Sequence, residues 1–351
     1  MSSDRKNILA AKINPPTSLL EQVASVQNLN AAWRECSRGK RTKAGYQKFL
    51  FRRGERLVGL RKQLLDGTFC WKGYREFVVK DPKARVIMAA PFSDRVVHHA
   101  IHRVLVPILD PHMSNASFAC RRRRGTSGAV VALFKHLQTL GERRYVVKLD
   151  VEKFFASISH EILLKQLFGG FSDAEKEHFI GALNDQSLLP LVSELVCKSH
   201  PILGALEKGI PIGNLTSQLF ANWTLTPADH FIEKNYPQVR HFRYMDDLVI
   251  VATQKKDALD CAHATVDFVR KALALEIPFS KFIPLAADPV PFLGYVLNHD
   301  GYRILARNRR RFAKHLRRLQ RRGCRDSLVA RSVESHRAWA CVPERVKPKV
   351  W

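Results

Sequence analysis

Two adjacent carboxylates interrupt an otherwise apolar, β-prone stretch between Phe242 and Val251. The residues on both sides favour strands, so we expect a hairpin with Asp246 and Asp247 at its tight turn. Neighbouring half-buried acids repel each other and need a compensating cation. A hard divalent metal with oxygen ligands meets this need. The alternative is a solvated Asp-Asp turn that binds nothing.

The balance of charged residues is the strongest signal in the composition. Lysine and arginine number 58 against 32 acidic residues, which gives the 351-residue chain a formal net charge of +26. This excess attracts a polyanion, so we expect nucleic acid as the partner and no membrane. The chain shows no apolar run long enough for a membrane span and no signal-peptide core, so we expect a cytoplasmic protein. Seven cysteines without a CxxC pair indicate reduced thiols.

Apolar patterns predict helices and strands in an irregular order. Strands are expected at 74–80, 85–90 and 145–150, the carboxylate hairpin at 241–252, and a last hairpin that joins 292–297 to 302–305. Helices are expected over most of 1–70, 91–110, 158–206 and 257–276, with a strand-and-helix unit around 209–232. This irregular alternation is typical of the α+β class with a mainly antiparallel sheet.

A third acid ends one of these strands. Asp150 follows an apolar strand, and Phe154 and Phe155 come shortly after it. If this strand lies beside the carboxylate hairpin, three acids converge, as two magnesium ions require for in-line phosphoryl transfer. Manganese is a possible substitute for magnesium. The alternative is an acid that merely ends a strand or caps a helix.

Two other segments have residue types suited to a phosphorylated ligand. Lys80 and Arg85 lie on the early hairpin, where arginine suits bidentate phosphate contact, although hairpin cations are often simply solvated. The segment Gly209–Gln218 is a glycine-containing turn that enters a helix. Such a turn lets the backbone approach a base pair or sugar, or it only starts the helix.

The order of these motifs resembles that of the reverse transcriptases. Their palm has an Asp-x-x-x-x-aromatic motif, then a glycine/serine motif, a Tyr-x-Asp-Asp turn, a lysine motif and a Phe-Leu-Gly hairpin. The counterparts are Asp150 with Phe155, Gly213 with Ser217, Tyr244 to Asp247, Lys281, and Phe292 to Tyr295. Upstream, Pro82–Arg85 and Asp94–Ala100 resemble the fingers motifs of bacterial group-II-like members.

The resemblance implies a right-hand polymerase fold and an RNA-directed DNA polymerase activity. We expect N-terminal helices and fingers over 1–144, an antiparallel palm over 145–300 with a helical insertion at about 158–206, and a basic helical thumb over 301–351. The expected ligands are template RNA, nascent cDNA and deoxynucleotides.

Residue roles follow from the same resemblance. Asp150, Asp246 and Asp247 correspond to the catalytic, metal-binding triad, with the Val151 carbonyl as an extra ligand. Phe155 corresponds to the steric gate that favours deoxynucleotides, and Lys281 to a lysine that protonates the leaving pyrophosphate, unless it is an ordinary surface lysine. The nucleotide-binding candidates are Lys80, Arg85, Phe154, Phe155, Ile212, Gly213 and Lys281. The template and primer candidates are Arg121, Arg122, Arg123, Arg124, Gln218, Tyr244, Phe292, Leu293, Gly294, Arg310 and Arg317.

The candidates near the C-terminus belong to a dense basic segment. Residues 307–322 combine basic side chains with an apolar stripe of Phe312, Leu316 and Leu319. This pattern predicts a helix that packs on one face and grips a duplex backbone with the others.

Two departures from the usual glycine motif indicate which group of reverse transcriptases the chain resembles. Most members have Gln-Gly-x-x-x-Ser-Pro, whereas this chain has Ile212-Gly213 and Ser217-Gln218. That form resembles the bacterial or phage enzymes of diversity-generating retroelements, which copy a template-repeat RNA into cDNA that is error-prone at adenines. These enzymes usually act with a small basic accessory protein that is oligomeric. Unlike a glutamine, Ile212 cannot hydrogen-bond the nascent base pair, so the geometry of the pair is checked less strictly. The alternative is that Ile212 is a neutral packing variant.

Three alternatives stay open at this point. One is another bacterial reverse transcriptase: a retron, an abortive-infection or defence enzyme, or a CRISPR-associated one. The second is a non-catalytic RNA-binding protein with a polymerase fold. The third is a viral RNA replicase, which Phe155 and Tyr244-Met245 disfavour.

Overall fold

The computed structural model describes residues 18–80, 84–141, 144–172, 179, 181–197, 205–278, 283–286, 289–321 and 326–340. The strands are β1 Arg75–Val79, β2 Arg85–Ala89, β3 Tyr145–Asp150, β4 Arg240–Tyr244, β5 Asp247–Ala252, β6 Ile283–Ala286, β7 Val290–Phe292, β8 Tyr295–Leu297 and β9 Tyr302–Ile304. The helices are α1 Leu19–Ala24, α2 Val26–Cys36, α3 Ala44–Phe51, α4 Arg53–Leu65, α5 Phe92–Leu109, α6 Gly125–Leu140, α7 Phe154–Ser157, α8 His160–Phe168, α9 Leu189–Cys197, α11 Leu215–Thr224, α12 Thr226–Asn235, α13 Lys255–Leu273, α14 Ala306–Arg321 and α15 Asp326–Ala340, with 3₁₀ turns η1 Asp110–His112 and η3 Gln186–Leu188.

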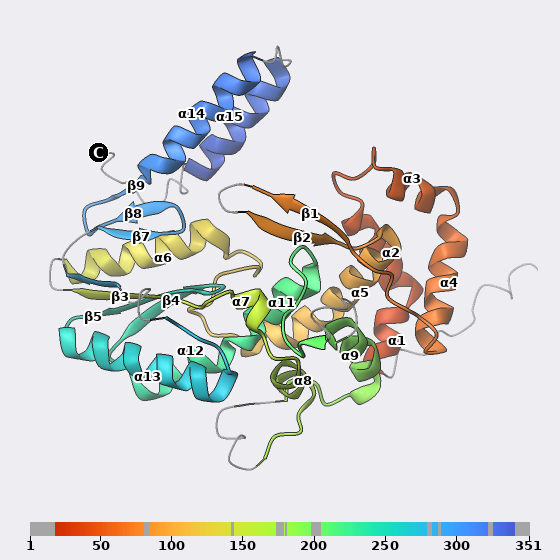
Figure 1. Ribbon diagram of the computed structural model, residues 1–351, viewed down its shortest axis with the longest axis horizontal. Coiled ribbons are helices and arrows are strands. Elements are labelled where there is room, and N and C mark those ends of the chain that lie inside the picture. Colours follow the sequence, from red (N-terminus) through yellow and green to blue (C-terminus); the bar gives the residue numbers. More distant parts are fainter. Residues whose placement is uncertain are drawn as a thin grey trace, which may run out of the picture.

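The central sheet has the strand order β4-β5-β3-β6, and every paired strand is antiparallel. Side chains alternate along its inner strands, so that Val249 and Val251 enter one core while Leu248 and Ile250 enter the other. Helix α6 covers the first face and α13 the second (Figure 1). Because both faces are covered, β5 is apolar from Leu248 to Ala252. The predicted α+β class with an antiparallel sheet is confirmed.

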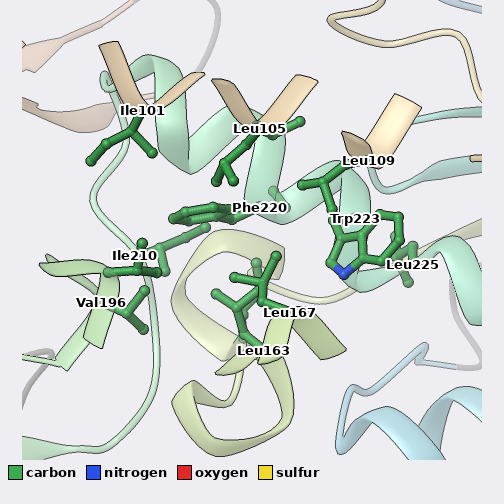
Figure 2. Packing of buried hydrophobic residues seen from close by; sticks show 14 of the residues in the cluster. Ile101, Leu105, Leu109, Leu163, Leu167, Val196, Ile210, Phe220, Trp223 and Leu225 are labelled. Carbon is green, nitrogen blue, oxygen red and sulfur yellow. The ribbon is translucent and has the colours of Figure 1, made fainter. Parts of the chain in front are cut away.

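The larger core lies where α5, α8, α9 and α11 meet. Phe220 of α11 is 1% exposed and lies among Leu105 of α5 and Leu163 and Leu167 of α8 (Figure 2). Such close packing of large apolar side chains is a main source of folding free energy. It fixes the second half of the glycine motif, because α11 begins at Leu215 and so contains Ser217 and Gln218 of that motif.

The hairpin of β1 and β2 follows the N-terminal helices, which themselves pack directly on α5. Its register pairs Val79 with Arg85, and the strands lie between α3 and α4 on one side and the central sheet on the other (Figure 1). The backbone N–H of Met88 in β2 donates a 2.8 Å hydrogen bond to the carbonyl of Ile212. The early hairpin is thereby attached directly to the glycine motif.

The last sheet corrects one prediction. The run 292–297 is not a single strand, because the chain turns at Leu293 and Gly294, where φ is +49° and +92°. Positive φ at both central residues is typical of a tight two-residue hairpin. β9 then pairs with β8, which gives the order β7-β8-β9. The apolar side chains on both sides of the turn conceal it in the sequence.

Three further differences concern the helices. Helix α6 was not predicted, and it packs on the sheet of β4. Around residue 209 the structure has an isolated bridge between Ser159 and Lys208 in place of a strand. Within 158–206, the described residues form α8, η3 and α9, and the remainder of that range lies partly outside the described residues.

Helices α14 and α15 lie side by side beyond β9 (Figure 1). Phe312, Leu316 and Leu319 of α14 are half-buried, while Arg310 and Arg317 are exposed. The predicted division of this helix into an apolar stripe and basic faces is therefore confirmed. No helix in the described part of the chain is both long and apolar enough to cross a membrane.

Candidate active site

The three acids meet at one end of the central sheet. Asp150 ends β3 and is the cross-strand partner of Asp247, the first residue of β5. Asp246 occupies the two-residue turn between β4 and β5 together with Met245, whose φ is +55°. A non-glycine residue in this left-handed region is uncommon and strained, and such strain concentrates at functional sites. The pairing that the sequence suggested is present.

The carboxylates are not arranged equivalently. Asp150 and Asp246 lie within hydrogen-bonding reach of each other. Asp247 instead directs Oδ2 to Lys148, and its Oδ1 is buried without a hydrogen-bond partner. Across the described ranges, no three His, Cys, Asp or Glu side chains form a complete metal-ligand group. The structure thus brings two of the three predicted ligands together and turns the third toward a lysine.

Burial dominates the electrostatics of this turn. Burial first, and then the neighbouring Asp150 and Asp247 carboxylates, raise the pKa of the Asp246 carboxyl to about 6, although its own backbone N–H opposes this. Burial also raises the pKa of Asp247, while the ammonium of Lys148 counteracts it. Acids in this situation favour a bound cation, because it replaces the lost hydration and cancels their repulsion.

Lys148 is a residue of the site that the sequence predictions missed. It lies on β3, two residues before Asp150, so both side chains leave the same face of the strand. Its Nζ lies 2.8 Å from Asp247 Oδ2, donates to the carbonyl of Pro291 at 3.2 Å and lies 5.9 Å from the Phe292 ring centroid. A lysine two positions before a strand-end acid is the signal that could have revealed it. Lys148 connects the acids to the β7–β8 hairpin.

Behind the turn, Arg243 of β4 is 1% exposed and is the largest fully buried side chain of the described chain. Its Nε and Nη2 donate to the Asp229 carboxylate of α12 at 2.8 and 2.6 Å. The remaining N–H groups donate to Asn222 Oδ1, the Asn222 carbonyl and the Met245 carbonyl at 2.9, 3.3 and 3.3 Å. All five guanidinium donors are therefore used. The last of these bonds holds the strained residue of the turn.

Asp229 is the anion of this buried network. Burial alone would raise the pKa of its carboxyl, but the Arg243 guanidinium and His241 beside it hold that pKa below its ordinary value. Asn222 also accepts from Ser117 Oγ at 2.9 Å. The network therefore joins β4, α11, α12 and the segment that precedes the four arginines.

The residues after Asp150 have different environments. Val151 and Phe154 are 4% and 3% exposed, and the Phe154 side chain belongs to the core. This corrects the prediction that Phe154 contacts the nucleotide. Phe155 is half-buried, its ring centroid lies 5.7 Å from that of Phe154, and its carbonyl accepts from the N–H of Ile210. Of the two aromatic residues, only Phe155 is placed to meet a ligand.

The early hairpin, which carries two of the nucleotide candidates, is hydrogen-bonded to the glycine motif. Arg85 is exposed on β2, the strand whose Met88 binds the Ile212 carbonyl. Gly213 has a φ of +126°, and a Cβ there would approach the Met88 carbonyl oxygen to 2.9 Å. Glycine is required at this position for both reasons. Lys80 is exposed just after β1, and Lys281 lies outside the described residues.

The four consecutive arginines do not form one basic patch. Arg121 has only 7% of its side chain exposed; it binds Asp110 at 2.6 Å and donates to the Ser114, Ser117 and Asp110 carbonyls. Arg124 donates to the carbonyl and side chain of Asn115. The buried Arg121 side chain is thus engaged with protein, which corrects its prediction as a direct template contact, whereas the half-buried Arg124 stays a candidate. Arg122 and Arg123 are exposed and stay candidates.

The remaining template and primer candidates also differ in exposure. Gln218 is exposed and accepts a contact from Cys120 Sγ at 3.6 Å, and Tyr244 is half-buried with its hydroxyl 3.3 Å from Thr126 Oγ1. Phe292 is 1% exposed and packs in the smaller core. Its predicted contact with a primer is therefore wrong, and only the half-buried turn of Leu293 and Gly294 is accessible.

The Lys148–Asp247 contact predicts a measurable coupling. Lys148→Met and Asp247→Asn, singly and combined, should show a coupling free energy of about 1–3 kcal/mol in urea unfolding, because the pair is largely shielded from solvent. The i,i+4 pair of the half-buried Lys165 and the exposed Glu161 is the matched control, and its coupling should stay below about 0.5 kcal/mol. Additive effects of the two substitutions at Lys148 and Asp247 would contradict the contact.

The raised pKa of Asp246 predicts how stability depends on pH without divalent metal. The folded protein binds the Asp246 proton more tightly than the unfolded chain does, so this proton stabilises the fold. Its contribution to the free energy of unfolding is fully present below the ordinary pKa of 3.8 and is lost as the pH rises through about 6. Asp246→Asn should remove this part of the slope in denaturant unfolding with a chelator present. Asp267→Asn, at an exposed position of α13, should keep the wild-type slope. If the free energy of unfolding depended on pH in Asp246→Asn as it does in wild type, the raised pKa could not belong to Asp246.

Comparison with known proteins places these features in a family. A model of the family described as reverse transcriptase (RNA-dependent DNA polymerase) matches residues 79–297, which is more than half of the chain. Protein YkfC of Escherichia coli K12 is 23% identical over 278 residues, covering 68% of this chain and 70% of YkfC. The putative COX1/OXI3 intron 1 protein of Saccharomyces cerevisiae is 25% identical over 176 residues, covering half of this chain and 20% of that protein.

The solved structures that match this chain have low sequence identity to it. Apo telomerase from Candida tropicalis gives a TM-score of 0.49 at 11% identity, covering 67% of this chain and 55% of the telomerase chain. A partial Cas6-RT-Cas1–Cas2 complex gives 0.40 at 20% identity, covering 73% and 42%. The chain thus spans about half the length of these structural relatives. On the family match, this protein belongs to the reverse transcriptase family and contains an RNA-directed DNA polymerase domain.

Proposed function

We propose that this protein is the reverse transcriptase of a diversity-generating retroelement, which copies a template-repeat RNA into cDNA with errors at adenines. The observation that carries the proposal is the glycine motif, with Ile212 and Gln218 where most members of the family have glutamine and proline. In the structure, Ile212 is half-buried and adjoins β2, which carries Arg85. The departure therefore lies against the strand that carries a candidate contact for the incoming nucleotide.

The acidic end of the sheet fits divalent metal ions. The supporting observations are the buried, unpaired Oδ1 of Asp247 and the close approach of Asp150 to Asp246. We propose Mg²⁺, with Mn²⁺ as a substitute, held by Asp150, Asp246, Asp247 and the Val151 carbonyl. When bound, such ions lower the pKa of an attacking hydroxyl and neutralise the leaving phosphates.

The residues of the chain have separate parts in this scheme. Asp150 and Asp246 supply carboxylates at the reacting end, and Lys148 holds Asp247 in place beside them. Arg85 and Lys80 bind the triphosphate by charge and hydrogen bonding, as guanidinium and ammonium groups do. Phe155 excludes a ribose 2′-hydroxyl. Lys281 is proposed as a proton donor to pyrophosphate.

Ile212 offers a physical route to error. A glutamine at this position could brace the nascent pair by hydrogen bonds, whereas isoleucine offers only an apolar surface. Discrimination that depends on shape alone is limited to a few kcal/mol, since a site without polar contacts leaves nothing unpaired when a wrong base enters. We propose that this relaxed check permits misincorporation opposite template adenine.

The proposed regions follow the predicted boundaries with two changes. Helix α6 covers the central sheet and is assigned to the palm, although it precedes residue 145. β9 belongs to the β7–β8 sheet and is also assigned there, so the thumb begins at α14. Template RNA and cDNA are the proposed ligands of Arg122, Arg123, Arg310 and Arg317, and a small basic, oligomeric accessory protein is the proposed partner.

The catalytic assignment is tested by primer extension on an RNA template with deoxynucleotides and Mg²⁺. Asp150→Ala and Asp246→Ala should each lower extension by at least about a thousandfold, because charge stabilisation is the main source of catalysis in phosphoryl transfer. Asp267→Asn should extend at the wild-type rate. Activity unchanged in Asp246→Ala would refute the site, and an inactive wild-type protein that still binds RNA would favour a non-catalytic role.

The retroelement assignment is tested by the error spectrum. Ile212→Gln should reduce misincorporation opposite template adenine by about tenfold, if the restored hydrogen bonds contribute about 1.4 kcal/mol of discrimination. Sequencing of the cDNA gives the spectrum. Leu215→Gln, at the half-buried first residue of α11, should leave the spectrum unchanged. Equal spectra for wild type and Ile212→Gln would favour another bacterial reverse transcriptase.

A further inference from the structure

A cavity of about 430 Å³ lies between α3, α4 and the start of α5. Its volume is within the range of about 300–1,000 Å³ that is usual for ligand pockets. Figure 1 shows α3 and α4 on the far side of the β1–β2 hairpin from the central sheet, so the cavity is separate from the candidate active site. We call it the N-terminal cavity and define it by the residues described below.

The rim of the N-terminal cavity is cationic. Lys48 of α3, Arg56 of α4 and Lys72 of the segment before β1 line it, and none of the described lining residues is acidic. These cations come from three separate parts of the chain. A hollow lined by one sign of charge concentrates the electrostatic field and attracts the opposite charge. An anionic group is the natural occupant.

The floor of the same cavity is apolar. Phe49, Leu60 and Phe92 form it, while Gln63 and Ser93 add neutral polar groups. The Arg56 guanidinium lies 5.6 Å from the centroid of the Phe49 ring, so a flat cationic surface covers part of the floor. A nucleotide unites the two properties, because its base is flat and apolar and its phosphate is anionic.

Two helical glycines line this space, Gly45 in the first turn of α3 and Gly59 in the middle of α4. Glycine in the middle of a helix costs about 0.5–1 kcal/mol relative to alanine, and this cost applies to Gly59. A Cβ at Gly59 would meet no atom within 4 Å, and one at Gly45 would make an ordinary 3.5 Å contact. Neither packing nor a positive φ requires glycine there. What both residues provide is room.

We propose that the N-terminal cavity binds one nucleotide of the single-stranded RNA template, outside the polymerase site. The phosphate would contact Lys48, Arg56 and Lys72, and the base would enter over Arg56 and the apolar floor. An RNA strand is favoured over a free nucleotide because the chain carries a net charge of +26, which suits a polyanion. The proposal rests on the proposed function only in taking RNA as the template.

The test fills the cavity without weakening the helix. Gly59→Leu places a side chain in the open space, and Gly54→Leu makes the same change in α4 at a position that does not line the cavity. Both substitutions should raise or preserve the midpoint of thermal unfolding, because leucine favours helices over glycine. Fluorescence anisotropy with a labelled single-stranded RNA oligonucleotide and the full chain then gives the affinity.

We expect Gly59→Leu to bind this RNA about tenfold more weakly and Gly54→Leu to bind it like wild type, since one stacked base contributes roughly that much. Arg56→Gln should lower the dependence of log affinity on log salt by about one, as the loss of one phosphate contact does. Equal affinity in both leucine variants would overturn the proposal. Adenosine monophosphate that binds wild type but not Gly59→Leu, with RNA affinity unchanged, would overturn it in favour of a free nucleotide.

A second measurement separates this proposal from the polymerase assignment. Primer extension by Gly59→Leu at saturating primer and template should proceed at the wild-type rate, because the cavity does not touch the acids. If wild-type protein fails to extend primers, the proposed function fails, whereas the RNA affinities of the two leucine variants still decide the cavity proposal. A fall in the saturated extension rate of Gly59→Leu with unchanged RNA affinity would contradict it.

Discussion

The buried ion pair of Arg243 and Asp229 is the interaction on which the acidic turn depends. Breaking a buried pair costs about 3–5 kcal/mol, because one charge then stays buried without compensation. Here the guanidinium also binds Asn222 and the Met245 carbonyl, so it joins β4 to two helices and to the turn itself. The turn combines a left-handed Met245 with two adjacent acids, both of which cost free energy. A network with every donor satisfied can hold such a turn rigidly, whereas a partly satisfied one cannot.

The sequence predicted the elements whose pattern depends on local rules. The bounds of β3 were correct to the residue, because a short apolar run between polar segments leaves one choice of strand. The sequence did not predict helix α6, because the helix starts with residues that do not favour helices: Gly125, Thr126, Ser127 and Gly128. The turn at Leu293 was hidden for the opposite reason: apolar residues continue through it, and only the backbone conformation distinguishes a strand from a hairpin.

In the candidate site, too, the sequence predicted what depends on local patterns and missed what depends on packing. The order of motifs located the three acids, because the family resemblance fixes which residues align. It could not say which side chains reach solvent. Arg121 and Arg122 are adjacent and chemically identical, yet one is bound to Asp110 inside the protein and the other is exposed. Phe292 belongs to a motif that suggested a primer contact, but alternation along β7 directs it into the core. Tertiary packing, which no local pattern encodes, decides these roles.

The 58 lysines and arginines of the chain therefore overstate the number of phosphate contacts that this protein can make. Lys148 compensates Asp247, Arg243 compensates Asp229, and Arg121 compensates Asp110, so these three cations are not available to nucleic acid. The exposed arginines of α14 are available, but contacts with phosphates do not depend on sequence. Selection at a particular template base must then arise where the chain meets the nascent base pair. In the function proposed above, this point is the segment of Ile212 and Gly213, which the hydrogen bond from the Met88 N–H attaches to β2.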